Sequence, residues 1–191
     1  MITCCHTWVR IVSILLLLLG GSVLTAGSAV AAESIKRYEV DLTVRADASM
    51  TVSETIVYDF GTDNRRGIFR TLPLQHHQEL TNPLQRRVID YDVGSVARDG
   101  VAEPYTVYTE NESLVIRIGD PDVMLAGSHT YELVYDVVGG LSYYDEEPPE
   151  LYWDVVGVDW DVPIEEAIVT INDPDNLFAD AVSCYTGPFE D

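Results

Sequence analysis

The sequence has 191 residues, with 32 Asp and Glu against 11 Lys and Arg, so its formal net charge at pH 7 is −21. This charge argues against a nucleic-acid partner, because binding to phosphates needs a basic surface that displaces counterions. The same excess argues against adsorption to an anionic membrane leaflet. Three interpretations of the acidity stay open: a generally acidic or salt-adapted surface, which we favour, calcium binding between loop carboxylates, and recognition of a cationic partner.

The first 32 residues have the order of a secretory signal peptide. Arg10 is the positive start, an apolar run covers residues 11–19, Gly20 and Gly21 interrupt it, and small residues end at Ala32. The apolar run is shorter than the roughly 20 residues that cross a bilayer as a helix. We therefore predict a signal peptide at residues 1–32, followed at residues 33–191 by one exported domain.

Along the exported part, apolar and polar residues alternate with the period of two that is typical of half-buried antiparallel strands. The alternation is clearest at residues 38–44, 52–60, 114–118 and 131–137, and further strands are expected at 68–72, 88–96, 104–109, 151–158 and 167–172. Turn residues stand between them at 47–49, 99–100, 110–113 and 139–140. The pattern predicts an all-β fold, an antiparallel β-sandwich of about eight strands that is immunoglobulin-like in general architecture.

Three aromatic residues form a candidate ligand platform: Tyr152, Trp153 and Trp160. Such rings can bind a sugar or a proline-rich peptide, but we favour the alternative that they fill the core or cap one end of the β domain. In an unbroken strand Trp153 and Trp160 would point to opposite faces. Gly157 between them is a place where a bulge would realign them.

Arg70 is a charged residue in an apolar setting, between Phe69 and Leu72. We expect it to form a partly buried structural ion pair with Glu54. The alternative is that Arg70 binds an anionic group of a ligand. A buried pair of this kind adds specificity more reliably than stability.

The sequence assigns no catalytic, cofactor-binding or metal-binding residue. Two acidic sets are candidate calcium ligands: Asp145, Glu146, Glu147 and Glu150, and Asp154, Asp159 and Asp161. Neither set has EF-hand spacing, and a solvated acidic face is favoured. His76 and His77 are interpreted as a surface loop because no third zinc ligand lies near. Hydrolase, metalloprotease, phosphate-loop and dinucleotide motifs are missing from the sequence. We therefore expect a protein that is not an enzyme and needs no cofactor, with calcium as the one candidate ion.

Cysteine usage bears on where the chain ends. Removal of the signal peptide takes away Cys4 and Cys5, so Cys184 is left without a second cysteine. An odd cysteine in an exported chain indicates either a partner elsewhere or a free thiol. We expect the sequence to be a fragment, with the disulfide partner of Cys184 beyond Asp191.

Four blocks of the exported part, taken in order, resemble a family of predicted bacterial and archaeal membrane proteins, catalogued as the domain of unknown function number twenty-two oh seven. They lie at residues 38–54, 67–73, 118–135 and 151–174, and the most specific contains Trp153-Asp154-Val155-Val156-Gly157-Val158-Asp159-Trp160. The resemblance implies an N-terminal extracytoplasmic β domain followed by transmembrane helices, and it implies no activity. Ala48 departs from the Asp-Gly that this family more often has, which makes a type I′ turn at 47–49 less favoured because Ala resists positive φ.

The leading functional hypothesis is a non-catalytic extracytoplasmic domain of a membrane-anchored envelope protein, which senses, binds or scaffolds a protein or glycan partner outside the membrane. Its attachment to the membrane would come from helices downstream of residue 191, and without them the chain would be secreted. One alternative is a carbohydrate-binding or carbohydrate-cleaving surface domain built on Trp153 and Trp160. A second alternative is a calcium-stabilised adhesion module.

Overall fold

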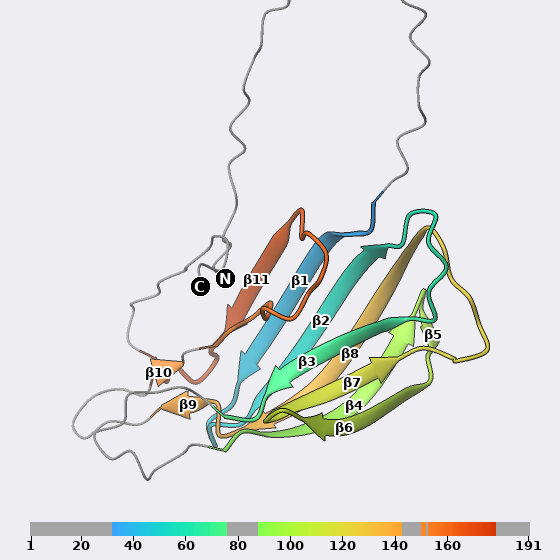
Figure 1. Cartoon of the computed structure of the whole chain (residues 1–191). Helices are drawn as coiled ribbons and strands as arrows, with labels where there is room; N and C mark the ends of the chain where they lie inside the picture. Colours follow the sequence, from blue (N-terminus) through green and yellow to red (C-terminus); the bar gives the residue numbers. More distant parts are fainter. Residues whose placement is uncertain (1–31, 76–87, 143–149, 152, 179–191) are drawn as a thin grey trace, which may run out of the picture.

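The computed structural model describes residues 32–75, 88–142, 150–151 and 153–178. These residues form eleven strands and no helix (Figure 1). The predicted signal peptide up to residue 31, His76 and His77, Tyr152 and Cys184 lie outside the described residues.

The largest sheet has six strands in the order β11-β1-β2-β8-β4-β5. Its strands are β1 (Ser34–Val44), β2 (Met50–Asp59), β4 (Asp90–Arg98), β5 (Val101–Ala102), β8 (Ser128–Val138) and β11 (Ala167–Asn172). Neighbouring strands are antiparallel except β1 and β11, which are parallel. The predicted strands at 38–44, 52–60, 88–96, 131–137 and 167–172 are therefore present, with ends displaced by a few residues.

A second sheet has three antiparallel strands in the order β3-β7-β6. Its strands are β3 (Ile68–Pro73), β6 (Tyr105–Glu110) and β7 (Ser113–Ile118). A short two-stranded sheet pairs β9 (Leu141–Ser142) with β10 (Glu150–Leu151). Figure 1 shows β3, β7 and β6 lying in front of the six-stranded sheet.

The core lies between these two sheets. In β2 every second residue is buried, and β8 shows the same alternation from Tyr131 to Val137, because successive side chains of a strand point to opposite faces. Ile68, Leu72 and Ile116 of the smaller sheet belong to the same hydrophobic cluster as the buried side chains of the larger one. The all-β class is thus confirmed, whereas the immunoglobulin-like sandwich is a finer statement that stays a prediction.

The turns follow their sequences closely. Asp99 and Gly100 both have positive φ between Arg98 and Val101, which is the two-residue type I′ turn that Asp-Gly favours. The turn after β1 is longer: the amide of Ala48 donates to the carbonyl of Arg45 at 2.9 Å, and Ala48 itself has φ of 65°. The turn is thus not of type I′, as Ala48 leads us to expect, but Ala48 still adopts a positive φ.

The strand predicted at 151–158 is wrong beyond Leu151. After β10 the chain runs through bends as far as the bridge at Ile164. Two of its carbonyl groups, those of Val155 and Val156, accept hydrogen bonds from the side chain of Arg70. These carbonyls therefore bind a buried guanidinium instead of a neighbouring strand, and the local sequence does not predict that contact.

Candidate functional site

The guanidinium of Arg70 lies between the six-stranded and the three-stranded sheets, at the centre of a buried hydrogen-bond network. Its side chain is 2% exposed and that of Glu54 is 0% exposed. The Nη2 atom of Arg70 lies 2.8 Å from Oε1 of Glu54, and Nε lies 3.0 Å from Oε2. The predicted ion pair between β3 and β2 is therefore present, and it is fully buried.

The remaining N–H groups of Arg70 also have acceptors. Nη1 donates to the carbonyls of Thr71 at 3.0 Å and Val156 at 3.1 Å, and Nη2 donates to the carbonyl of Val155 at 3.1 Å. An arginine has five N–H donors in a fixed planar arrangement. All five are used by groups of the chain itself, so Arg70 ties β3 to both β2 and the segment 153–160.

Glu54 is bound by two tyrosine hydroxyls as well. Tyr38 on β1 donates to Oε2 at 2.8 Å, and Tyr135 on β8 donates to Oε1 at 2.6 Å. Both hydroxyls come from the strands that flank β2 in the six-stranded sheet. The ring of Tyr38 also lies beneath the guanidinium of Arg70, with 5.8 Å from Cζ to the ring centroid.

The electrostatics agree with this geometry. Burial raises the pKa of Tyr38 and of Tyr135 well above that of a free tyrosine, so both stay protonated and donate to Glu54. Burial alone would lower the pKa of Arg70, but attraction by the Glu54 carboxylate raises it well above its usual value. The network is therefore a charged pair with neutral donors around the anion, and its chemistry is that of a structural cross-link.

The segment 153–160 is shaped to fit this arginine. A Cβ on Gly157, where φ is +80°, would lie 2.7 Å from Nη1 of Arg70. The amide of Gly157 donates to Oδ1 of Asp154 at 3.0 Å, and Nε1 of Trp160 donates to the carbonyl of Val156 at 2.9 Å. Gly157 is thus a position of close approach at which a side chain has no room.

Of the predicted platform, Trp153 and Trp160 are described and Tyr152 is not. Both tryptophans are half-buried and pack against the hydrophobic core. Trp160 contacts Tyr38 edge-on with centroids 5.9 Å apart, whereas Trp153 lies 6.3 Å from the ring of Tyr91 on β4. Because their aromatic neighbours belong to different strands, the two indoles cover separate parts of the core, and the geometry favours the capping role.

The acidic residues named as candidate calcium ligands are described only in part. Among the described residues no group of three His, Cys, Asp or Glu side chains is gathered so that it could hold one. Asp154 caps the turn at Gly157, and Asp159 and Asp161 are exposed. Glu150 lies in β10, and Asp145, Glu146 and Glu147 fall outside the described residues.

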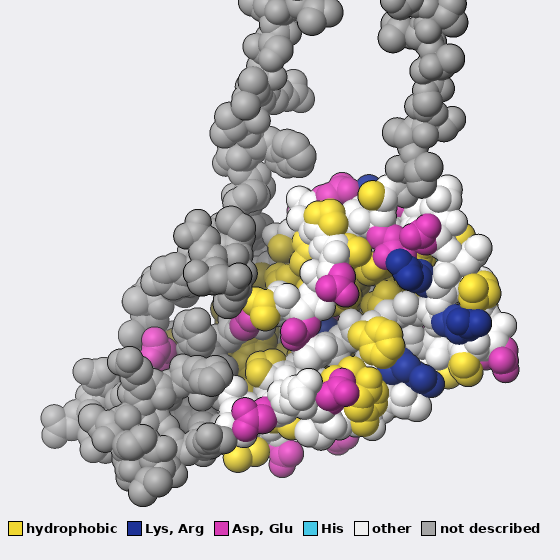
Figure 2. All heavy atoms as spheres, viewed as in Figure 1, with side chains coloured by type: hydrophobic (Ala, Val, Ile, Leu, Met, Phe, Trp, Pro, Cys, Tyr) yellow, Lys and Arg dark blue, Asp and Glu magenta, His cyan; other side chains and the backbone are white. Residues whose placement is uncertain are grey.

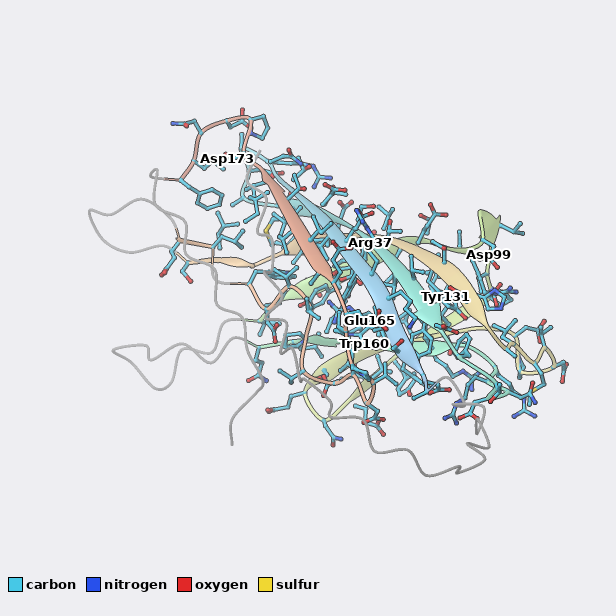
Figure 3. All side chains as sticks on the ribbon, turned by 90° about the horizontal axis from the view of Figure 1, so that it is seen from above. Arg37, Asp99, Tyr131, Trp160, Glu165 and Asp173 are labelled. Carbon is cyan, nitrogen blue, oxygen red and sulfur yellow. The ribbon has the colours of Figure 1, made fainter. Side chains whose placement is uncertain are left out.

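A second ion pair lies at the end of the six-stranded sheet that carries Asp99 and Tyr131, opposite the end with Asp173 (Figure 3). Nη2 of Arg98 on β4 lies 3.1 Å from Oε2 of Glu103, whose side chain is 6% exposed. At the same end, Asp99 accepts from the amide of Thr130 at 2.9 Å and contacts His129, and both interactions lower its pKa. The Arg98–Glu103 pair thus joins β4 to the segment between β5 and β6, and Asp99 joins the turn after β4 to β8.

The outer face of the three-stranded sheet carries exposed apolar side chains. Phe69 is 55% exposed and Tyr108 is 41% exposed, and Phe69 pairs in register with Arg117 on β7. Figure 2 shows large hydrophobic side chains beside Lys and Arg side chains over this sheet. Phe69, Arg117 and Tyr108 therefore lie on one exposed face of the smaller sheet.

Sequence reasoning found Arg70 and Glu54 but missed the two tyrosines. Tyr38 and Tyr135 occupy apolar positions in the alternation at 38–44 and 131–137, and both are buried in their strands. The signal that could have found them is Glu54 itself, which occupies a core-facing position of β2 between Val52 and Ile56. A carboxylate in that position needs several donors, and tyrosines on the neighbouring strands supply them.

Comparison with known proteins supports the family and little beyond it. The family model described as "Predicted membrane protein (DUF2207) N-terminal domain" matches residues 34–191. No curated protein matches the sequence. No helix among the described residues is long and apolar enough to cross a membrane.

Among solved structures, the chain is similar to yeast LTA4 hydrolase in complex with bestatin, at 12% identity and a TM-score of 0.44, over 74% of this chain and 23% of the hydrolase. It is also similar to an M1 zinc metallopeptidase from Deinococcus radiodurans, at 12% identity and a TM-score of 0.36, over 55% of this chain and 20% of the peptidase. The chain thus spans less than a quarter of the length of either enzyme. Scores at this level carry no argument about function.

Proposed function

The chain belongs to the DUF2207 family of predicted membrane proteins, and on that premise we propose that it is the extracytoplasmic, non-catalytic contact domain of a membrane-anchored envelope protein. In this proposal the domain binds or scaffolds a partner outside the membrane. Residues 1–32 direct its export, and segments beyond residue 191 hold it at the membrane.

The proposal of a non-catalytic domain rests on the Arg70–Glu54 pair, whose donors and acceptors are bound by other groups of the chain. A catalytic acid, base or anion-binding arginine needs a free donor or acceptor that faces the substrate. Arg70 instead gives its N–H groups to Glu54 and to the carbonyls of Thr71, Val155 and Val156, while Glu54 accepts from two tyrosines. This arrangement supports a rigid scaffold.

The contact role is supported by the outer face of the β3-β7-β6 sheet. Phe69 and Tyr108 are exposed there, and exposed apolar residues on one face are typical of interaction sites. Tyrosine, phenylalanine and arginine are also enriched at protein interfaces. A rigid sheet that presents such residues is suited to binding without chemistry.

Orientation is tested by labelling cells that express the protein with its native downstream sequence. Both variants are made with Cys4, Cys5 and Cys184 replaced by Ser. Phe69→Cys then places a single thiol on the exposed face, and Ile116→Cys places one in the core, where Ile116 is 0% exposed. A membrane-impermeant maleimide added to intact cells should label the first variant and leave the second unlabelled until the protein is denatured. Labelling of Phe69→Cys only after the cells are lysed would contradict an extracytoplasmic domain.

The contact role is tested by placing a photo-crosslinking amino acid at Phe69 in the same cells, with the exposed Val138 as the control position. Val138 is 59% exposed and lies in β8, in the other sheet. A crosslinked product should form from position 69 and not from position 138. Equal crosslinking from both positions would show that the outer face has no particular contact role.

A further inference from the structure

Among the described strands, β6 is a regular and exposed sheet edge. It is the outermost strand of the order β3-β7-β6, and within the described residues it pairs only with β7 (Figure 1). All six of its residues are exposed, with Tyr105, Val107 and Tyr108 at 36%, 42% and 41%. Its outward-facing N–H and C=O groups are therefore available to another strand.

The other outer strands differ from β6 in length, sequence or exposure. Natural proteins blunt edges with charges, prolines, bulges or very short strands. The strand β5 has two residues, and β3 carries Arg70 and ends in Pro73. The strand β11 is uncharged and regular, but its residues 168–171 are half-buried, whereas β6 is exposed along its whole length. The pairing of β6 with β7 runs in regular register over all six residues, without Pro or bulge.

The composition of β6 favours pairing with a strand of the same kind. Residues 105–109 read Tyr-Thr-Val-Tyr-Thr, all of which have high β-propensity and none of which is charged. In a chain with a net charge of −21, an uncharged run is where two copies approach with the least repulsion. Its first charge, that of Glu110, lies at its end.

Symmetry then restricts the register, and the uncharged run 105–109 has Val107 at its centre. A two-fold axis normal to the sheet makes two β6 strands antiparallel and keeps the outer faces on one side, so opposing residues must come from the same face. Centring the axis on Val107 sets Val107 against itself, Thr106 against Tyr108 and Tyr105 against Thr109. Aromatic and β-branched residues are favourable cross-strand partners, and Glu110 stays outside the paired segment.

We propose that β6 is a self-association edge, through which two copies of this chain pair antiparallel about Val107 and join their three-stranded sheets into one. An interface of one short strand is small, so the dimer is weak in solution and depends on concentration. Attachment to a membrane, which rests on the proposed function, would raise the effective concentration of the copies. The pairing itself does not depend on that attachment.

The first test is disulfide crosslinking of the whole chain, in a background with Cys4, Cys5 and Cys184 replaced by Ser. In Val107→Cys the two thiols face each other across the axis, where opposing Cα atoms of an antiparallel pair are about 4.5–5.5 Å apart, within disulfide range. Val138→Cys is the matched control, because Val138 is more exposed, at 59%, and lies in the other sheet. We expect crosslinked dimer to form at least about tenfold faster from position 107, and equal rates would overturn the proposal.

The second test is sedimentation velocity over a wide concentration range. The dimer fraction should rise with salt, because the Debye length falls from about 30 Å at 0.01 M to about 8 Å at 0.15 M and screens the repulsion between acidic copies. Val107→Lys should abolish the dimer, while Val138→Lys should leave it unchanged, with circular dichroism showing that both variants are folded. A dimer that persists in Val107→Lys, or a chain that is monomeric at every concentration and salt, would refute the edge. Either result would leave the maleimide and photo-crosslinking tests of the contact domain unaffected.

Discussion

Replacement of Glu54 by Gln should be among the most damaging isosteric changes that this domain can receive. The side chain keeps its size, but an amide NH2 takes the place of one carboxylate oxygen. That oxygen accepts from Arg70 and from a tyrosine hydroxyl, so a donor would face donors, and Arg70 would lose its anion in a site where its side chain is 2% exposed. Leaving one member of a buried ion pair without its partner costs about 3–5 kcal/mol.

A loss of that size is a large part of the stability of a single domain, which is about 5–15 kcal/mol. It is measured by urea unfolding followed by tryptophan fluorescence, comparing midpoints at an unchanged slope. Glu39→Gln is the matched control, because Glu39 pairs with Arg37 on the exposed side of β1 and solvent screens that pair. Its midpoint should stay close to that of the parent chain. The argument fails if Glu54→Gln shifts the midpoint no more than Glu39→Gln does.

Three further outcomes follow from the backbone and the tyrosines. Gly157→Ala should lower the free energy of unfolding in urea by about 1–3 kcal/mol more than Gly100→Ala does. Both glycines have positive φ, but only at Gly157 would a Cβ lie 2.7 Å from Arg70. Equal losses would mean that the segment shifts without cost. Ala48→Gly should raise the unfolding free energy by about 1 kcal/mol, because Ala48 has φ of 65° and glycine adopts that conformation without a steric penalty; an unchanged melting temperature would argue against strain at this turn. The free energy of unfolding should fall as the pH rises above about 10, where the tyrosines of the unfolded chain ionise. Burial raises the pKa of the folded tyrosines, so the unfolded state binds fewer protons than the folded state in this range. The loss is up to about 1.4 kcal/mol per pH unit for each tyrosine. The tyrosines concerned are Tyr38, Tyr58, Tyr91, Tyr131 and Tyr135. An unfolding free energy that does not fall as the pH rises above about 10 would contradict this.

The pairing of Glu54 with Arg70 shows how far residue patterns reach toward the site. An arginine between Phe69 and Leu72, and a glutamate among the inward residues of β2, are both exceptions to the local apolar alternation. Two buried charges of opposite sign must meet, because neither can be buried alone. The sequence therefore predicts that Glu54 and Arg70 pair. It does not predict the hydrogen bond from Arg70 to the carbonyl of Val155, which lies 85 residues further along the chain.

The strand predicted at 151–158 shows the limit of the same reasoning. Its aromatic and β-branched residues favour a strand, but its carbonyls bind a guanidinium that comes from β3. A strand needs a neighbour for its backbone groups, and here the neighbour is a side chain. Local propensity therefore gives way to a tertiary hydrogen bond.

What the sequence determines alone is the all-β class, most of the strands, the Asp-Gly turn and the chemical identity of the buried pair. These depend on the period of two, on turn residues with positive φ and on the cost of burying a charge, all of which act locally or pairwise. The tertiary structure decides that Tyr38 and Tyr135 complete the carboxylate site, that Trp153 and Trp160 cover separate parts of the core, and that β6 stands at an open edge. The reason is that strand order sets which side chains converge and which backbone groups stay unpaired, and strand order depends on contacts between residues far apart in the chain.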